Sequence, residues 1–277
     1  MLDQHKIGFI GGGNMAQALA NGLLSQGLPK ESIHILEINP DLLTQWHARG
    51  ITAQALPDQA LADCDVWVLA VKPQVMSEVV AHAKPFIQAH TLALSIAAGI
   101  PMVSISKWLG EANQPWPYVV RCMPNTPALV GEGAMGLASL STVTSKQKKV
   151  ADTIMQTVGH VVWVDSDNEI DAVTALSGSG PAYVFRFLEA LIDGGVALGL
   201  SPENARSLAL ATLSGATKLA QNSTDELSVL RERVTSKGGT TAAALDVLAQ
   251  NHFYETLQKA MQAAHKRAGE LAEEFGQ

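Results

Sequence analysis

Cysteine and aromatic residues are scarce in this chain of 277 residues. The two cysteines, Cys64 and Cys122, lack metal-ligand spacing, which excludes a disulfide framework and favours reduced thiols in a cytoplasmic protein. Histidines show no H-x-x-x-H pattern, so we expect no bound metal. Aromatic residues make up only 5% of the chain, which favours tight helix packing and a large subunit interface.

Positive charge is also scarce. Lys and Arg number 19 against 26 Asp and Glu, for a net charge of -7, and no basic stripe occurs that would predict nucleic-acid binding. The short run 146–149, with three lysines, is typical of a solvated helix face. No apolar run approaches the roughly 18 residues of a membrane span, and Met1–Lys6 shows no signal-peptide pattern. We expect a soluble cytoplasmic protein.

What is abundant is apolar residues, 47% of the chain, over a length that favours two domains. Short, continuously apolar runs alternate with helical patterns in the first half. Such runs predict a parallel sheet covered by helices on both faces. The expected strands are Ile7–Ile10, Ile33–Leu36, Asp65–Val71, Leu92–Ile96, Tyr118–Cys122 and Val161–Val164.

From Glu169 onward the pattern is helical nearly throughout. The boundary is expected near residues 164–168, with a domain over residues 1–165 and a second over 166–277. The predicted fold class is therefore α/β plus all-α, with an N-terminal Rossmann-type parallel sheet domain and a C-terminal helical domain.

A glycine motif follows the first strand directly after Ile10. Gly11, Gly12, Gly13, Asn14, Met15 and Ala16 fit G-x-G-x-x-A at the start of a helix. The first glycine permits the tight turn, the second lets a pyrophosphate approach the backbone, and Ala16 lets the helix pack on the strand. In this context the motif predicts a dinucleotide site rather than an ordinary glycine-rich turn.

Glu37 and Asn39 follow the second strand, where an acid accepts hydrogen bonds from the adenosine ribose and repels a 2′-phosphate. No arginine follows closely to bind such a phosphate. This local pattern indicates that NAD is accepted at least as well as NADP. Asn39 can hydrogen-bond either form, so the preference stays open.

Other strand ends supply further cofactor candidates, since ligands of doubly wound sheets bind at the carboxyl ends of strands. Ala70, Val71, Lys72 and Pro73 end the third strand; Lys72 either faces the cofactor or is an exposed lysine before a proline-started helix. Ile96, Ala97 and Ala98 end the next strand in a run that is rich in small residues, which suits a flat ring lying close to the backbone. Asn125 either holds the nicotinamide or the substrate, or makes an Asx-type turn.

A second glycine loop lies in the helical half. Ser236, Lys237, Gly238, Gly239, Thr240 and Thr241 lead into a helix. The glycines remove side-chain bulk, and the threonine hydroxyls stand beside the unpaired amides of the first helical turn, where the helix dipole favours an anion. The loop predicts a cradle for a small carboxylate or phosphate.

With these pieces in place, the chain resembles the Δ1-pyrroline-5-carboxylate reductases. Four blocks carry the resemblance in the same order: 70–73, 121–127, the Leu-Ser-Gly-Ser-Gly-Pro-Ala-Tyr run 176–183, and the loop 234–241. We interpret the run 176–183 chiefly as a tight helix junction that borders the site. Lys237 replaces the family's usual proline, the usual His-Pro is missing before the loop near Glu226, and Glu37 replaces a small or polar residue.

The resemblance implies a reductase that uses NADP or NAD and a helical domain that interlocks with a second subunit into a homodimer, with decamers built from such dimers. It implies that Asn39, Ala70–Pro73 and Ile96–Ala98 line the cofactor, and that the loop of one subunit faces the nicotinamide of the other. Ser236, Gly239, Thr240 and Thr241 match the residues that hold the substrate carboxylate and ring nitrogen. Gly238 is included as a substrate-binding candidate.

Hydride transfer to the C=N bond of 1-pyrroline-5-carboxylate, giving L-proline, is the expected reaction. Thr241 is the candidate catalytic residue, as a hydrogen-bond partner of the ring nitrogen. A β-hydroxyacid dehydrogenase needs a G-x-x-x-K helix, and Gly215 and Lys218 have the wrong spacing for it. The alternatives are that dehydrogenase, another NAD(P)H-dependent imine reductase, and a nicotinamide-sensing protein without turnover.

Overall fold

The computed structural model describes residues 4–276. Of the segment Met1–Lys6 discussed above, residues 1–3 lie outside the described residues. The chain forms two compact units. One holds the residues up to Ser179 together with those from Ala263 on, and the other is Gly180–Gln262. The last strand ends at Trp163, close to the domain boundary predicted after residue 165, and that boundary stays a prediction.

An eight-stranded sheet forms the first unit, in the order β3-β2-β1-β4-β5-β6-β7-β8. All six predicted strands are present, and the stretch from β3 to β6 is parallel. The strands are β1 Ile7–Ile10, β2 Ile33–Leu36, β3 Thr52–Gln54, β4 Val66–Leu69, β5 Leu92–Ser95, β6 Val119–Met123, β7 Gly133–Ser139 and β8 Gly159–Trp163.

The pairing of β6 with β7 corrects the expectation of a wholly parallel sheet, since it is antiparallel, with Arg121 opposite Ala138. The connection 124–132 is shorter than the dozen or more residues that a parallel crossover needs. The next pair, β7 with β8, is parallel again. Strand β7 was not predicted because Gly, Ala and Ser dominate it, and β3 was not predicted because it has only three residues.

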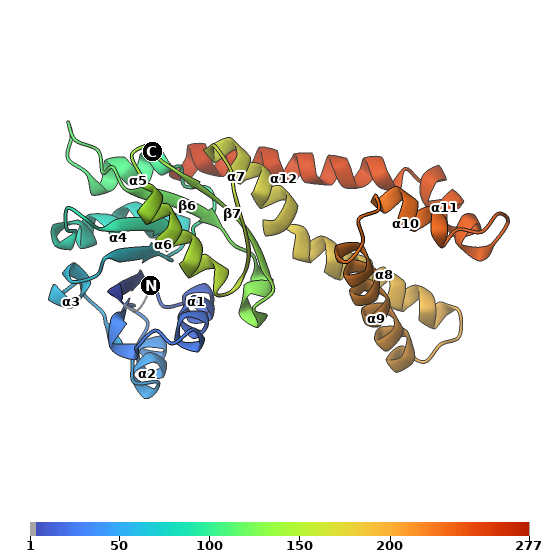
Figure 1. Cartoon of the computed structure of the whole chain (residues 1–277), viewed down its shortest axis with the longest axis horizontal. Helices are drawn as coiled ribbons and strands as arrows, with labels where there is room; N and C mark the ends of the chain where they lie inside the picture. Colours follow the sequence, from blue (N-terminus) through green and yellow to red (C-terminus); the bar gives the residue numbers. More distant parts are fainter. Residues whose placement is uncertain (1–3, 277) are drawn as a thin grey trace. The chain divides into compact units, whose positions relative to one another are not determined.

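Helices cover both faces of this sheet (Figure 1). Alternate side chains of β1 enter different cores: Ile7 and Phe9 join the core that holds Trp46, and Ile10 joins the core that holds Trp67. The helices are α1 Asn14–Ser25, α2 Pro40–Ala48, α3 Gln59–Ala62, α4 Met76–Ala83, α5 Met102–Leu109, α6 Ser145–Gln156 and α7 Asp167–Val173, followed by a π-helical turn Thr174–Gly178.

The C-terminal turns of α12 (Phe253–Phe275) belong to the sheet unit. Leu271 packs against Gly99, and the Ser104 hydroxyl donates to the carbonyl oxygen of Gly276. Figure 1 shows the C-terminal end of the chain beside α5.

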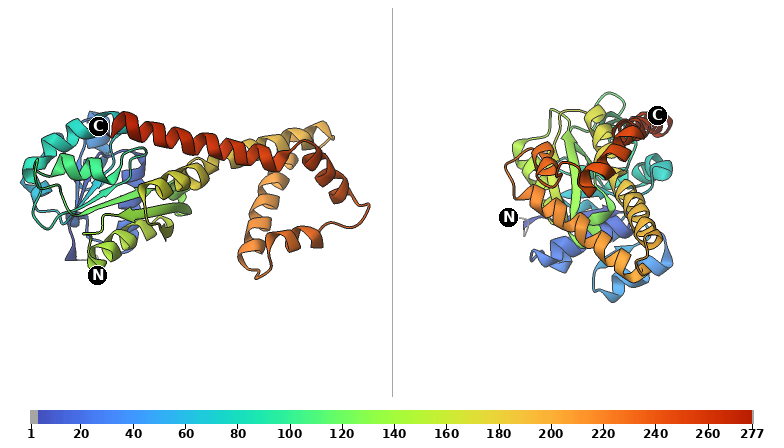
Figure 2. Two further views of the ribbon diagram at one scale, coloured as in Figure 1. Left: turned by 90° about the horizontal axis from the view of Figure 1, so that it is seen from above. Right: turned by 90° about the vertical axis from the view of Figure 1, so that its right-hand side faces the viewer.

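The second unit contains helices only, among the described residues (Figure 2). They are α8 Gly180–Ala197, α9 Pro202–Gln221, α10 Leu227–Arg233, α11 Thr240–Gln250 and the first turns of α12. No helix in the described part of the chain is long and apolar enough to cross a membrane. Apolar side chains nevertheless stay exposed here, including Phe185, Leu198 and Leu208, which is typical of a surface that a partner covers. The predicted fold class is confirmed.

Candidate active site

The glycine loop after β1 has the backbone that its sequence predicts. Gly11 has φ +103°, and a Cβ there would lie 2.8 Å from the carbonyl oxygen of Ala70. Only glycine fits such a position without strain. A Cβ on Gly13 would meet no protein atom within 4 Å. The loop therefore leaves open space at the glycine that is expected to face a pyrophosphate.

Helix α1 begins directly after this loop, with Gly13 as its N-cap. No side chain caps the helix and no acid stands in its first turn, so its first amide N–H groups are offered to an anion. Asn14 is exposed and Met15 is half-buried, whereas Ala16 is buried between the helix and the sheet. These are the features that pyrophosphate binding requires.

The parallel sheet brings the other predicted cofactor residues to the same edge. The N–H of Ala70 donates to the carbonyl oxygen of Ile10 at 2.8 Å, and that of Ile96 to Leu69 at 3.1 Å. The loops 70–73 and 96–98 therefore adjoin the glycine loop at the carboxyl ends of β1, β4 and β5. Lys72 is exposed and precedes a short 3₁₀ helix that starts at Pro73, as predicted, and its contact with the cofactor stays a prediction.

Glu37 lies at the carboxyl end of β2 and binds the glycine loop. Its Oε2 accepts from the N–H of Gly12 at 2.8 Å, and its Oε1 accepts from the N–H of Asn39 at 2.8 Å. Asn39 itself caps α2, because its Oδ1 accepts from the N–H groups of Asp41 and Leu42. The carboxylate thus links the loops that follow β1 and β2.

Trp46 supports the glycine loop, a role that was not predicted from the sequence. Its indole Nε1 donates to the carbonyl oxygen of Gly12 at 3.0 Å, and the ring is fully buried. A Cβ on Gly12 would lie 2.6 Å from that nitrogen, which explains glycine at the middle position of the motif. No local pattern signals this contact, since the two residues are 34 positions apart.

Asn125 follows β6, and its side chain makes neither an Asx-type turn nor a cap on its own 3₁₀ helix. Its Oδ1 accepts from the N–H of Ala134 in β7 at 2.9 Å, and its Nδ2 donates to the carbonyl oxygen of Ser177 at 3.0 Å. The residue is buried. Its side chain therefore connects the end of β6 to β7 and to the π-helical turn. A contact between Asn125 and a ligand stays a prediction.

The second glycine loop lies on the helical unit and leads into α11. Gly238 has φ +72°, and a Cβ on Gly239 would collide with the hydroxyl oxygen of Ser236. Gly239 is the N-cap of α11, and no side chain caps that helix, whereas Ser201 caps α9. The first-turn amides beside Thr240 and Thr241 are thus offered to an anion, as the sequence predicts.

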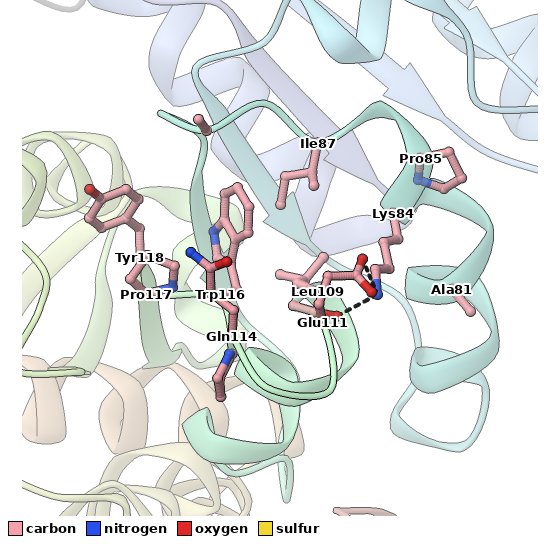
Figure 3. Close-up of a pocket in the computed structure, with 13 residues that line it drawn as sticks. Ala81, Lys84, Pro85, Ile87, Leu109, Glu111, Gln114, Trp116, Pro117 and Tyr118 are labelled. Carbon is pink, nitrogen blue, oxygen red and sulfur yellow. Dashed lines mark hydrogen bonds and ion pairs between the residues drawn. The ribbon is translucent and has the colours of Figure 1, made fainter.

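A separate surface hollow of about 690 Å³ lies at the amino ends of β5 and β6 (Figure 3). Trp116 and Tyr118 line one side, and Lys84 forms an ion pair with Glu111 at 3.0 Å on the other. The glycine loops are not among its lining residues. Because it adjoins the opposite ends of the strands, we assign it no part in the cofactor site.

Neither thiol nor metal chemistry is supported by the described residues. Burial raises the pKa of the Cys64 thiol to about 12 and also raises the pKa of Cys122, so both stay protonated near neutral pH. No group of three or more His, Cys, Asp or Glu side chains in residues 4–276 is placed to hold a metal ion.

Comparison with known proteins places these features in a family. Residues 167–271 match the model for pyrroline-5-carboxylate reductase dimerisation, and residues 6–99 match that of the NADP oxidoreductases described as coenzyme F420-dependent. A pyrroline-5-carboxylate reductase from Pseudomonas aeruginosa is 44% identical over 98% of both chains. The chain belongs to the pyrroline-5-carboxylate reductase family.

Solved structures of pyrroline-5-carboxylate reductases agree. One from Coxiella burnetii is 39% identical, with a TM-score of 0.89 and coverage of 97% of this chain and 98% of that one. One from Plasmodium falciparum, with NADP bound, is 32% identical, with a TM-score of 0.85 over 98% and 99% of the chains. This pyrroline-5-carboxylate reductase family member is therefore an NAD(P)H-dependent oxidoreductase, as predicted, and its dimerisation region indicates an oligomer.

Proposed function

We propose that this protein reduces 1-pyrroline-5-carboxylate to L-proline with NAD(P)H, the last step of proline biosynthesis. One observation carries the proposal: two helices, α1 and α11, begin at glycine N-caps with no side-chain cap and no acid in the first turn. One suits the pyrophosphate of a dinucleotide and the other a small carboxylate. A reductase of an imino acid needs both.

The residues at the sheet edge fit a nicotinamide dinucleotide. In this proposal Ile10 to Ala16 hold the pyrophosphate, Glu37 and Asn39 the adenosine ribose, and the loops 70–73 and 96–98, with Asn125, the remainder. When bound, the reduced nicotinamide supplies a hydride, with its electron pair, to the C=N carbon of the substrate. The π electrons of the C=N bond pass to the nitrogen, which keeps its proton as the amine of the product.

The loop 236–241 holds the substrate. The amides of Gly238 and Thr240, with the Ser236 hydroxyl, bind the carboxylate. It lies beside Gly239, whose own N–H donates to the carbonyl oxygen of Ser236 at 3.0 Å. The half-buried Thr241 hydrogen-bonds the ring nitrogen. A protonated imine is already electrophilic, so no strong acid is required. Fixing the ring relative to the hydride donor supplies most of the rate, about 7–11 kcal/mol for well-oriented reactants.

The assembly proposed is a homodimer, with dimers associating into a decamer, in the cytoplasm. The exposed apolar side chains of the helical unit support such an interface. In the dimer, the loop 236–241 of one subunit serves the nicotinamide of its partner.

The test is to mix the protein with pyrroline-5-carboxylate and NADPH or NADH and to follow nicotinamide absorbance. A fall in absorbance with proline as product is expected. Turnover of acyclic or six-membered imines with none of pyrroline-5-carboxylate would identify a different imine reductase. Oxidation of a β-hydroxyacid would favour that dehydrogenase class, and dinucleotide binding without turnover of any of these would indicate a sensor.

A further inference from the structure

The carboxylate of Glu37 is fixed in place at the sheet edge. Each of its oxygens accepts one backbone N–H, from Gly12 and from Asn39, both at 2.8 Å. Each oxygen keeps a further lone pair that can accept another hydrogen bond. The negative charge therefore stays at the end of β2 while remaining able to accept from a ligand hydroxyl.

The surroundings of Glu37 prevent an easy change of its position. The peptide of Gly12 is held from its carbonyl side by the indole of Trp46 at 3.0 Å. A Cβ on Gly12 would lie 3.2 Å from the Cβ of Glu37, so loop and side chain are closely packed. Moving the carboxylate away would leave the N–H groups of Gly12 and Asn39 without their acceptor.

Cations that would favour a phosphate are missing from the adjoining chain. The segment 37–45 contains Glu37 and Asp41 but no Lys or Arg. Arg49, the next Lys or Arg in the chain, lies over the Trp46 ring at 4.4 Å and hydrogen-bonds the Asn21 side chain. Arginine or lysine is the usual partner of a 2′-phosphate, and it is not supplied by this segment.

We propose that Glu37 makes this protein select NADH over NADPH. The ribose 2′-hydroxyl of NADH donates to the fixed carboxylate, whereas the 2′-phosphate of NADPH places a dianion beside it. The inference rests on the proposed function and deepens it. Family membership alone does not imply a preference for NADH, because the structure of the relative from Plasmodium falciparum has NADP bound.

Binding of NADH and of NADPH to the full-length protein, followed by quenching of tryptophan fluorescence, tests the proposal without turnover. We expect at least tenfold tighter binding of NADH. In Glu37→Gln the ratio of the two Kd values should fall several-fold, chiefly because NADPH binds more tightly. Glu31→Gln, which removes an exposed acid before β2, is the matched control and should leave the ratio unchanged.

Varying the salt concentration distinguishes electrostatic repulsion of the 2′-phosphate from a steric effect of Glu37. The disadvantage of NADPH in the wild-type protein should shrink as ionic strength rises, because repulsion between the carboxylate and the phosphate is screened. Glu37→Ser, which also removes the charge, provides the same comparison where the Gln variant unfolds.

Equal or tighter binding of NADPH by the wild-type protein would overturn the proposal, and so would an unchanged ratio in both Glu37 variants. Failure of the wild-type protein to bind either dinucleotide would overturn the proposed reductase function itself. Selective binding of NADH without any turnover of pyrroline-5-carboxylate would support the role of Glu37 and refute the substrate assignment.

Discussion

The side-chain amide of Asn125 donates to the carbonyl oxygen of Ser177 across 3.0 Å and ties the end of β6 to the π-helical turn. The same side chain accepts from the N–H of Ala134, and Gly178 packs so closely that a Cβ there would lie 2.8 Å from the Met123 side chain. The end of β6, the start of β7 and the π-helical turn thus meet at one buried amide. π-Helical turns occur frequently at functional sites.

Asn125→Ala should destabilise the protein by about 1–3 kcal/mol, because it leaves the part-buried N–H of Ala134 and the part-buried carbonyl oxygen of Ser177 without their partner. It should also lower kcat, since the turn is predicted to border the proposed site. Urea unfolding and steady-state kinetics measure the two effects. Asn222→Ala, which removes an exposed bond to Lys218, is the control and should cost less than about 0.5 kcal/mol. Unchanged stability of the Asn125 variant would contradict the bridging role.

Arg121 is a buried residue of β6 that binds two carboxylates of α7. Its guanidinium contacts Asp167 Oδ1 at 2.8 Å and Asp171 Oδ1 at 2.7 Å. Arg121→Met would leave the buried Asp171 carboxylate unpaired, at a cost of about 3–5 kcal/mol of unfolding free energy. Thermal and urea unfolding provide the measurement.

Two further variants make this result specific. Arg121→Met combined with Asp171→Leu should recover part of the loss, since the uncompensated charge is gone. Arg186→Met, which breaks an exposed ion pair with Glu189, should change the free energy of unfolding by less than about 1 kcal/mol. Equal losses in Arg121→Met and Arg186→Met would show that burial of the Arg121 pairs is unimportant.

Local patterns predicted the parts of the fold that local physics determines. Continuously apolar runs located six strands, and the glycines at positions 11 and 239 located helix starts, because the backbone there must turn tightly or approach a ligand. Pro73 likewise marked the start of a short helix.

Long-range pairings could not be predicted in this way. The contact of Asn125 with Ser177 spans 52 positions, and that of Trp46 with Gly12 spans 34. A buried polar group needs a partner, but nothing in its own neighbourhood says which one the fold supplies. The antiparallel strand β7 was not predicted because its small residues have little preference for strands.

His34 makes stability depend on pH. Burial lowers its pKa below the ordinary value of 6.5, against the opposing attraction of Asp58, whose Oδ1 lies 3.2 Å from Nε2. The unfolded chain therefore takes up a proton at a higher pH than the folded protein does. Stability should fall as pH drops below about 6.5, because protons then bind the unfolded state preferentially.

The free energy of unfolding of the wild-type protein and of His34→Gln, measured between about pH 7.5 and 5, tests this effect. The variant should lose stability less steeply as pH falls. A steeper acid loss in His34→Gln than in the wild type would contradict the direction assigned here.

Thr241 stands in the first turn of α11 and is the proposed partner of the ring nitrogen. Thr241→Ala should lower kcat by about 10²-fold, much more than it weakens NADH or NADPH binding, because the lost hydrogen bond no longer holds the ring in line with the hydride donor. Thr153→Ala, on α6 of the sheet unit, is a control that should keep full activity. An unchanged kcat in Thr241→Ala would remove the proposed role.

Lys237 places an exposed cation in the loop proposed to hold the substrate carboxylate. Lys237→Gln should raise the KM for pyrroline-5-carboxylate about two- to fivefold at low salt with little change in kcat, as expected for an exposed charge worth about 0.3–1 kcal/mol. The difference should vanish at high ionic strength. Lys218→Gln on α9 tests for a nonspecific charge effect, and Lys237→Pro separates loop stiffness from charge. A rise in KM that persists in high salt would mean that Lys237 acts through the conformation of the loop and not through its charge.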